Sequence, residues 1–114
     1  MSTAKPRLRA GLKRRAAVFA SLGDPIRLSL VLTLSAGPPQ SISRLAEHAQ
    51  ITRQGLTRHL RTLEHAGVVH STRIGRESVF AFRPEPLREL RTYLEQVSAE
   101  WDDALGRLKA FVER

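Results

Sequence analysis

The chain of 114 residues contains no cysteine. Disulfide bonds, thiolate metal sites and redox-sensing thiols are therefore excluded. Long hydrophobic runs are also missing, because the uncharged stretch of residues 28–42 is broken by Gly-Pro-Pro after Ala36. No transmembrane helix and no membrane partner are expected. The length fits one domain, and the lack of disulfides fits a cytosolic protein.

Acidic residues are absent from the first 23 positions, which carry six basic side chains. Residues 24–40 are neutral overall, residues 41–83 carry +4 and residues 84–114 carry −2, within a net charge of +8. A polyanionic partner would therefore meet residues 1–23 and 41–83. We expect residues 1–11 to form a flexible basic arm and residues 12–114 to form the folded domain. A transit peptide is the alternative, but the segment runs directly into a predicted helix.

Two helices are predicted before residue 40. In residues 12–22 the apolar side chains, including Phe19, recur near one face, and Gly23 follows as a stop signal. Asp24 then precedes a proline, which is the pattern of an N-cap and a first helical position. Residues 25–35 are apolar most of the way round, so we expect them to form the central buried helix.

Two shorter amphipathic helices follow, separated by a break near residues 50–52. Ser41 or Ser43 caps the first of them, and Thr52 caps the second. Leucines at helical spacing anchor the second helix to the core: Leu56, Leu60 and Leu63. Gly67 is a stop signal for this helix.

A short β-hairpin is predicted after that helix. Residues 68–73 alternate in polarity toward Gly75, and residues 78–82 return. Two short helices followed by a hairpin form a winged helix-turn-helix, a mainly α fold with a small β-hairpin. The second of the two short helices enters the DNA major groove in this fold.

The predicted reading helix carries polar side chains opposite its leucines. Arginine reads guanine and glutamine reads adenine through paired hydrogen bonds, while threonine or arginine holds phosphate. The hairpin adds arginines beside Gly75, and the negative potential of the DNA minor groove attracts arginine side chains. The expected DNA-binding residues are Thr52, Arg53, Gln54, Thr57, Arg58, Arg61, Arg73 and Arg76. The alternative interpretation of the arginines is a solvated charged face.

Signals of a metal site or an active site are absent. The four histidines have no partner four residues away and no cysteine partner, and we expect His59 to pack between the reading helix and the hairpin. Asp102 and Asp103 are adjacent and point in different directions on a helix. No nucleophile–base pair and no glycine-rich phosphate loop appear. We therefore expect no enzyme, no metal and no cofactor.

The last predicted helix, residues 87–114, has apolar residues at steps of three and four. This spacing is typical of helix–helix packing. About 28 residues span about 42 Å at 1.5 Å per residue, which is longer than this small domain can cover. We therefore expect another helix to pack on it. The apolar seam consists of Leu87, Leu90, Leu94, Val97, Trp101, Ala104, Leu108 and Phe111, widened by Leu105.

Several phrases of the sequence resemble the ArsR/SmtB transcriptional regulators. FASLGDPIRL, from Phe19, is similar to the phrase that opens the family's second helix. TRHL, from Thr57, and LEHAGVV, from Leu63, are similar to its helix-turn-helix, and GRESVF, from Gly75, to its wing. The resemblance covers roughly residues 16–95, and its motifs are specific in combination.

The resemblance implies a homodimer, paired through the first and last helices, that represses transcription from an inverted repeat. The dimerisation residues are expected to be Phe19, Leu87, Leu90, Leu94, Val97, Trp101, Leu105 and Leu108. Many members sense metal through cysteines at the third helix or through histidines and acids on the last helix. This chain has no cysteine, and its last helix has no histidine, so we expect metal-dependent release to be absent. A small-molecule inducer, if one exists, would bind near the dimer interface.

Two other functions are compatible with the same pattern. A non-specific architectural DNA-binding protein would draw its affinity from the basic arm and the hairpin. A protein-interaction module would use the last helix after losing DNA binding, although the basic reading face argues against it. For a specific regulator we expect a cytoplasmic location in association with the nucleoid.

Overall fold

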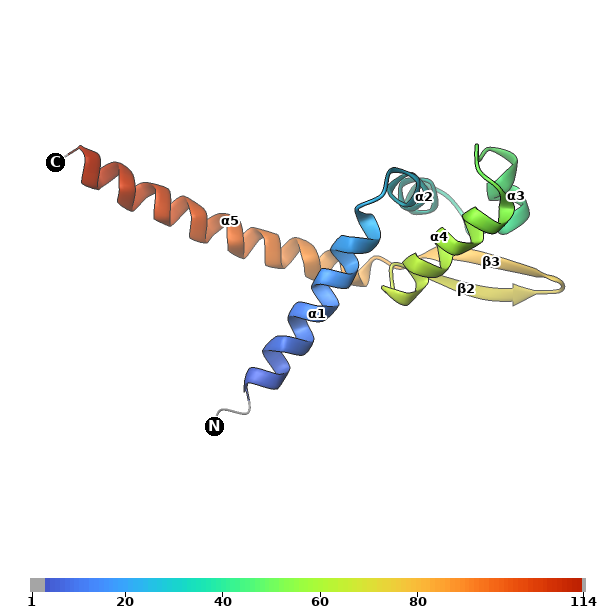
Figure 1. Ribbon diagram of the computed structural model, residues 1–114, viewed down its shortest axis with the longest axis horizontal. Coiled ribbons are helices and arrows are strands. Elements are labelled where there is room, and N and C mark those ends of the chain that lie inside the picture. Colours follow the sequence, from blue (N-terminus) through green and yellow to red (C-terminus); the bar gives the residue numbers. More distant parts are fainter. Residues whose placement is uncertain (1–3, 114) are drawn as a thin grey trace.

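The computed structural model describes residues 4–113. Within them, five helices and three short strands form the predicted winged helix-turn-helix (Figure 1). The elements are α1 (Ala4–Leu22), α2 (Pro25–Ala36), β1 (Gln40–Ser41), α3 (Ile42–Glu47), α4 (Arg53–His65), β2 (Val69–Ile74), β3 (Glu77–Phe82) and α5 (Glu85–Val112). Figure 1 shows α3, α4 and the β2–β3 hairpin gathered at one end, with α1 and α5 extending from the body in different directions.

Helix α1 begins at Ala4, well before the predicted start at residue 12. The predicted flexible arm, residues 1–11, is therefore helical from Ala4 onward, and its residues 1–3 lie outside the described residues. Alanine, leucine, lysine and arginine are strong helix formers. Pro6 falls in the first turn, where the missing N–H interrupts no helical hydrogen bond. A high density of basic residues indicated an arm, but it does not prevent a helix.

The face of α1 that meets the core differs from the predicted one. Val18 and Ser21 are buried, whereas Leu12 and Phe19 are 52% and 42% exposed. The Ser21 hydroxyl donates to the Val18 carbonyl at 2.7 Å, so its burial leaves no polar group unpaired. Helix α1 therefore has two adjacent stripes, one packed on the core and one apolar stripe that faces solvent.

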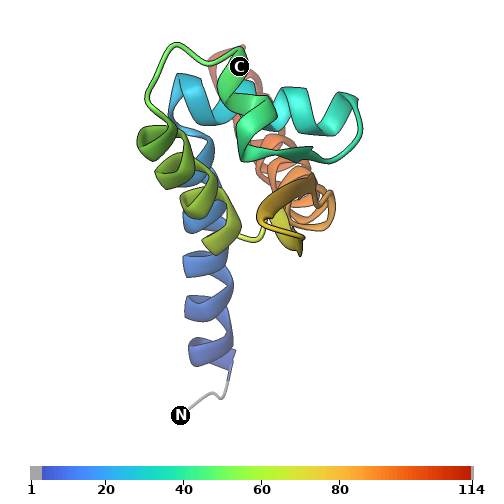
Figure 2. The same ribbon diagram turned by 90° about the vertical axis from the view of Figure 1, so that its right-hand side faces the viewer.

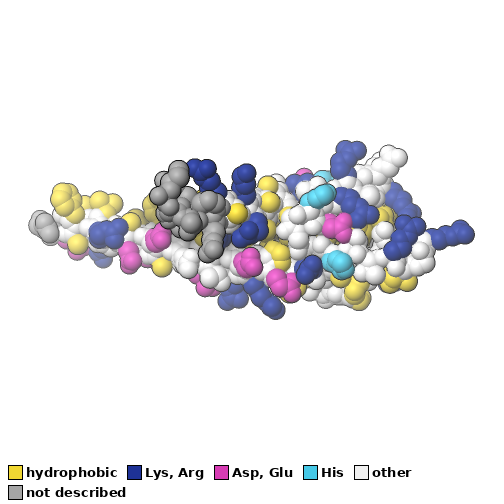
Figure 3. All heavy atoms as spheres, turned by 90° about the horizontal axis from the view of Figure 1, so that it is seen from below, with side chains coloured by type: hydrophobic (Ala, Val, Ile, Leu, Met, Phe, Trp, Pro, Cys, Tyr) yellow, Lys and Arg dark blue, Asp and Glu magenta, His cyan; other side chains and the backbone are white. Residues whose placement is uncertain are grey.

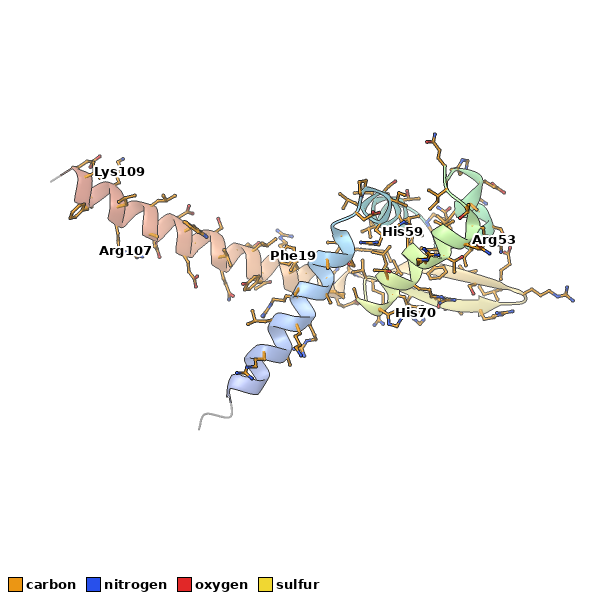
Figure 4. The ribbon with its side chains drawn as sticks, viewed as in Figure 1. Phe19, Arg53, His59, His70, Arg107 and Lys109 are labelled. Atoms are coloured by element: carbon orange, nitrogen blue, oxygen red, sulfur yellow. The ribbon has the colours of Figure 1, made fainter. Side chains whose placement is uncertain are left out.

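A hydrogen-bond network joins α1, α2 and α4. Asp24 caps α2 as predicted, and it accepts from the backbone N–H groups of Ile26 at 2.9 Å and Arg27 at 3.0 Å. The Arg27 Nε donates to the Ser21 carbonyl at 2.7 Å, and its Nη1 lies 3.1 Å from His59 Nδ1. Figure 4 shows His59 on the side of α4 that faces α2. The prediction that His59 packs between α4 and the hairpin is wrong, because Arg27 holds the ring at the other side.

Helix α2 is only half covered. Its core residues are Leu30, Val31 and Leu34, whereas Leu28 is exposed and Leu32 is 63% exposed. The expectation of a central buried helix is therefore wrong for the single chain, because other elements cover only one face of α2. No single helix in residues 4–113 is long and apolar enough to cross a membrane. Only α1 and α2 together meet that length and composition, and they bend by 95° where they join.

Side-chain caps fix the two helices of the helix-turn-helix. Ser41 Oγ accepts the backbone N–H three residues on at 3.1 Å and caps α3. Thr52 Oγ1 does the same for α4 at 3.0 Å. The leucines predicted to anchor α4 are all fully buried: Leu56, Leu60 and Leu63. Gly67, with φ of +80°, ends α4 and turns the chain into the hairpin.

The sheet contains one strand that the sequence did not predict. Strand β1 pairs antiparallel with β3, which gives the order β1-β3-β2. Two residues are too few to produce an alternating pattern, so β1 is found only from its partner. The central strand β3 carries Phe80, which is fully buried. Gly75, with φ of +62°, opens the two-residue turn between β2 and β3.

Helix α5 divides into a packed and an unpacked part. Leu90 is buried in the chain's own core, Leu87 packs against that core, and Arg15 of α1 lies 4.8 Å from the centre of the Tyr93 ring. Leu87 and Leu90, which we assigned to dimerisation, therefore stabilise the single chain. Beyond them the seam is largely exposed, and Trp101 is 64% exposed. Figure 1 shows this distal part standing clear of the body.

Candidate nucleic-acid interface

Helix α4 presents a polar face opposite its buried leucines. Arg53, Gln54 and Arg58 are exposed on this face. Figure 4 shows Arg53 at the end of α4 that lies nearest α3. Among residues 9–113, whose side chains the structure describes, the arginines that form ion pairs are other ones: Arg61, Arg83 and Arg91. The three polar side chains of α4 are therefore available to base edges.

Two threonine hydroxyls border this face with defined hydrogen bonds. Thr52 Oγ1 accepts from the Gly55 N–H at 3.0 Å, and Thr57 Oγ1 donates to the Arg53 carbonyl at 2.8 Å. The hydrogen of the Thr52 hydroxyl and the lone pairs of the Thr57 oxygen take no part in these two bonds. A Cβ at Gly55 would lie 3.2 Å from Thr52 Oγ1. The glycine therefore keeps this cap free of a tight contact.

The hairpin brings a second set of basic side chains to the same end of the molecule. Arg73 and Arg76 are exposed on either side of Gly75. Figure 2 views this end and shows α4 beside the hairpin, in agreement with the contacts between α4 and β2. In Figure 3, arginine side chains, drawn in dark blue, project from this end of the molecule. The structure thus brings the predicted α4 and hairpin residues into one basic surface.

A cluster of hydrogen bonds and an ion pair links the hairpin to α4. The Glu64 carboxylate accepts from the Ser71 backbone N–H at 3.1 Å and also from the Ser71 hydroxyl. Arg61 Nη1 lies 2.7 Å from Glu64 Oε1, and its guanidinium lies 5.4 Å from the centre of the Phe80 ring. Arg61, which we expected to contact DNA, is thus engaged between α4 and the hairpin. Glu64 and Ser71 were missed, because no periodic signal links them across the turn.

The Glu64 contacts have a sign that pH can test. Burial raises the pKa of Glu64, but the hydrogen bonds from Ser71 and Arg61 outweigh it and leave the pKa below its ordinary value of 4.5. A lowered folded-state pKa stabilises the fold fully above the unfolded value, and this stabilisation is lost as pH falls through the folded value. Glu64→Gln is therefore expected to lower the free energy of unfolding at neutral pH by about 1–2 kcal/mol.

Urea denaturation at neutral pH and at about pH 3 measures this effect. Glu77→Gln, at the exposed start of β3, is the matched control and should change the free energy by less than about 0.5 kcal/mol. The difference in unfolding free energy between the wild type and Glu64→Gln should be smaller at about pH 3 than at neutral pH. Equal losses of stability in Glu64→Gln and Glu77→Gln, or a difference that does not change with pH, would contradict the stabilising role of Glu64.

Other kinds of site find little support in residues 4–113. No three histidine, aspartate or glutamate side chains there lie close enough together to hold a metal ion. Every buried side-chain nitrogen or oxygen described has a hydrogen-bond partner. Asp102 and Asp103 are exposed on α5, beside the exposed Trp101. The best-supported candidate site in the described residues is therefore the basic face of α4 and the hairpin.

Comparison with known proteins gives the same result. Residues 22–72 match the family of helix-turn-helix domains. The chain is 36% identical over 80 residues to YuzN, an uncharacterised helix-turn-helix transcriptional regulator of Bacillus subtilis strain 168. That match covers 65% of this chain and 87% of YuzN.

Solved structures extend the similarity to the whole fold. An ArsR-like transcriptional regulator from Rhodococcus sp. RHA1 has a TM-score of 0.79 and 32% identity, covering 90% of this chain and 95% of its own. A homodimeric winged helix-turn-helix DNA-binding domain from Mycobacterium bovis, a possible ArsR-family regulator, has a TM-score of 0.64 and 21% identity. It covers 92% of this chain and 91% of its own. Because the Rhodococcus regulator is 32% identical and is covered over 95% of its length, the chain belongs to the ArsR family of DNA-binding transcriptional regulators, which are not enzymes.

Proposed function

We propose that the protein is a homodimeric repressor that binds an inverted-repeat operator. The observation that carries this proposal is an uncovered apolar seam on the same chain as a basic reading surface. Phe19 of α1 and Leu94, Trp101 and Leu108 of α5 are all large apolar side chains exposed to solvent. Contiguous exposed apolar surface of this kind marks protein interfaces. The homodimeric state of the Mycobacterium bovis domain also supports a dimer.

Two-fold symmetry would give the protein two DNA-reading surfaces, each made of α4 and the hairpin of one chain, which we call reading heads. A second copy packed on the exposed apolar stripe of α1 and the distal part of α5 leaves α4 and the hairpin of each chain free, since α5 extends away from them (Figure 1). Dimeric helix-turn-helix proteins bind half-sites about 10 base pairs apart, or a multiple of this. Because the two heads are related by symmetry, the operator is an inverted repeat.

Each reading head divides its contacts between bases and phosphates. We assign Arg53, Gln54 and Arg58 to base edges in the major groove. Thr52 and Arg44 are assigned to phosphates. Arg44 was not singled out from the sequence, but it is exposed on α3, and the first helix of a helix-turn-helix crosses the DNA backbone.

The wing residues have a different role in the complex. We assign Arg73 and Arg76 to the minor groove or the neighbouring backbone, where the negative potential attracts arginine. Arg61 keeps its contact with Glu64 and sets the position of the hairpin. In this proposal, repression follows from occupancy of the promoter by the dimer.

Selection of binding sites from a random DNA pool tests the proposal. We expect a motif with two-fold symmetry and half-sites about one helical turn apart. An asymmetric motif would count against the symmetric dimer. Recovery of no motif, together with steep salt dependence, would favour the non-specific architectural protein instead. A reporter gene placed behind the selected site then distinguishes repression from activation.

We further propose that no metal ion controls this repressor. The chain has no cysteine, and residues 4–113 contain no cluster of three acidic or histidine side chains. Calorimetric titration with zinc, cadmium and arsenite should therefore show no saturable binding, and zinc should leave operator affinity unchanged. Tight binding of one ion per subunit would overturn this part of the proposal.

A further inference from the structure

A cavity of about 580 Å³ lies behind the reading helix, between α2 and the turn that joins α3 to α4. We name it the α2 cavity. Ser29 and Thr33 of α2 line one side, and residues 48–51 of the turn line another. Buried core leucines also line it: Leu30, Leu45 and Leu56. Its volume falls in the range of roughly 300–1,000 Å³ that is usual for small-molecule sites.

The lining of the α2 cavity has few ionisable groups for a strongly basic protein. It contains no aspartate, glutamate, lysine or arginine and one histidine, the exposed His48, although the chain carries a net charge of +8. A cationic ligand would lose hydration there without gaining a counter-charge, and an anionic ligand would meet His48 as its only ionisable partner. Hydrogen-bonding groups are present, because Ser29 and Thr33 lie one turn apart on α2 and Gln40 and Gln50 also line the cavity. We propose that the α2 cavity binds a neutral, mainly apolar small molecule with one or two hydrogen-bonding groups.

The position of the α2 cavity connects such a ligand to DNA binding. Ile51 and Leu56 both line it, and between them lie Thr52, which caps α4, and the reading residues Arg53 and Gln54. A ligand there contacts the segment that sets the position of the first turn of α4. The regulatory consequence rests on the proposed function: occupancy lowers operator affinity, and operator DNA lowers ligand affinity by the same factor.

The other candidate position is less suitable for this ligand. We expected an inducer near the dimer interface, between the first and last helices. The cavity between α1 and α5 has a volume of only about 250 Å³, and Arg14, Arg15 and Glu89 line it. Because the cavity between α1 and α5 is smaller and is lined by charged side chains, the α2 cavity is the better site for a neutral apolar molecule.

Three probes with one ring and different charges test the ligand class. We would titrate the full chain with benzyl alcohol, benzoate and benzylammonium and follow backbone amide shifts by NMR. Benzyl alcohol should cause saturable shifts at Ser29, Thr33 and residues 49–51, with an affinity at least about 10-fold above that of either ion. Equal affinities for the three probes, or no saturation at these amides, would overturn the proposal.

Substitutions that fill the cavity test its location. Ser29→Phe and Thr33→Phe each place a ring at the lining and should weaken benzyl alcohol binding by about 10-fold or more. Both positions are exposed on α2, so neither substitution crowds the core, and two variants guard against misfolding of one. Ser35→Phe is the matched control, because Ser35 is exposed on the same helix but does not line the cavity. Wild-type affinity in both filled variants would refute the location.

The link to DNA needs a separate measurement. Fluorescence anisotropy with the selected operator should show weaker binding when benzyl alcohol is present, by about 5- to 150-fold at saturation. Bound operator should weaken the probe by the same factor. Probe binding that leaves operator affinity unchanged would overturn the regulatory role. Failure to find any operator would instead overturn the proposed function, while the NMR result on the cavity would still stand.

Discussion

Replacing Arg58 with alanine is expected to weaken binding to the selected operator by about 5- to 150-fold, or about 1–3 kcal/mol. Arg58 is exposed on the outer face of α4, two positions beyond the fully buried Leu56. A guanidinium in that position can donate two hydrogen bonds to guanine, and alanine leaves those acceptors without their donors. Base preference at the contacted position should relax as well.

Arg88→Ala is the matched control for this experiment. Arg88 is exposed on α5, on the side away from the apolar seam, so its loss removes the same charge far from the reading surface. Its operator affinity should stay within about two-fold of the wild type. Anisotropy titrations on the operator and on a scrambled duplex measure both effects. Equal losses in the two variants would reduce Arg58 to a contributor of general positive charge.

Trp101→Glu is expected to raise the dissociation constant of the dimer by about 1,000-fold or more, which corresponds to about 4 kcal/mol. An indole buries about 150–250 Å² in an interface, worth about 4–6 kcal/mol at 25 cal/mol per Å². Symmetry removes two indoles at once and places two carboxylates in their positions. Operator affinity should fall with the dimer, because a single subunit contacts only one half-site.

Ala99→Glu provides the control on the same helix. Ala99 is exposed on α5, two residues before Trp101, and therefore lies on the side away from the seam. Sedimentation equilibrium should find this variant as dimeric as the wild type and Trp101→Glu monomeric at micromolar concentration. A dimer that survives Trp101→Glu would show that the distal part of α5 does not pair.

Local signals in the sequence were enough to predict most of the elements. Asp24 and Thr52 cap the helices that they were expected to cap. Gly67 and Gly75 adopt positive φ at the predicted ends of a helix and a strand. These features depend on neighbours within a few residues, so a single sequence contains all the information that determines them.

Contacts between elements could not be predicted in the same way. Helix α1 carries two apolar stripes, and periodicity alone could not decide that Val18 meets the core while Phe19 faces outward. The a/d pattern of α5 likewise runs without a break from Leu90, which is buried in its own chain, to the exposed Leu108. One pattern serves intramolecular and intermolecular packing, because both need the same apolar side chains.

The DNA-facing arginines of α4 show the same difference between local signals and contacts between elements. The outward position of Arg53 and Arg58 follows from the leucine spacing of α4, since residues opposite a buried stripe must face solvent. The engagement of Arg61 with Glu64 depends on where the hairpin folds back, which no local signal specifies. For Arg61 the structure therefore adds an intramolecular contact that the leucine spacing of α4 does not indicate.

The junction between the hairpin and α5 has a consequence for operator evolution. Pro84 and Pro86 restrict the backbone of this junction, and Gly67 at the end of α4 lies beside the Pro86 ring. In the proposed dimer, the two reading heads are therefore held at a fixed spacing. One inserted base pair moves a half-site by about 3.4 Å and turns it by about a tenth of a revolution. Operators of this regulator should tolerate base substitutions more readily than insertions or deletions that change the spacing between half-sites.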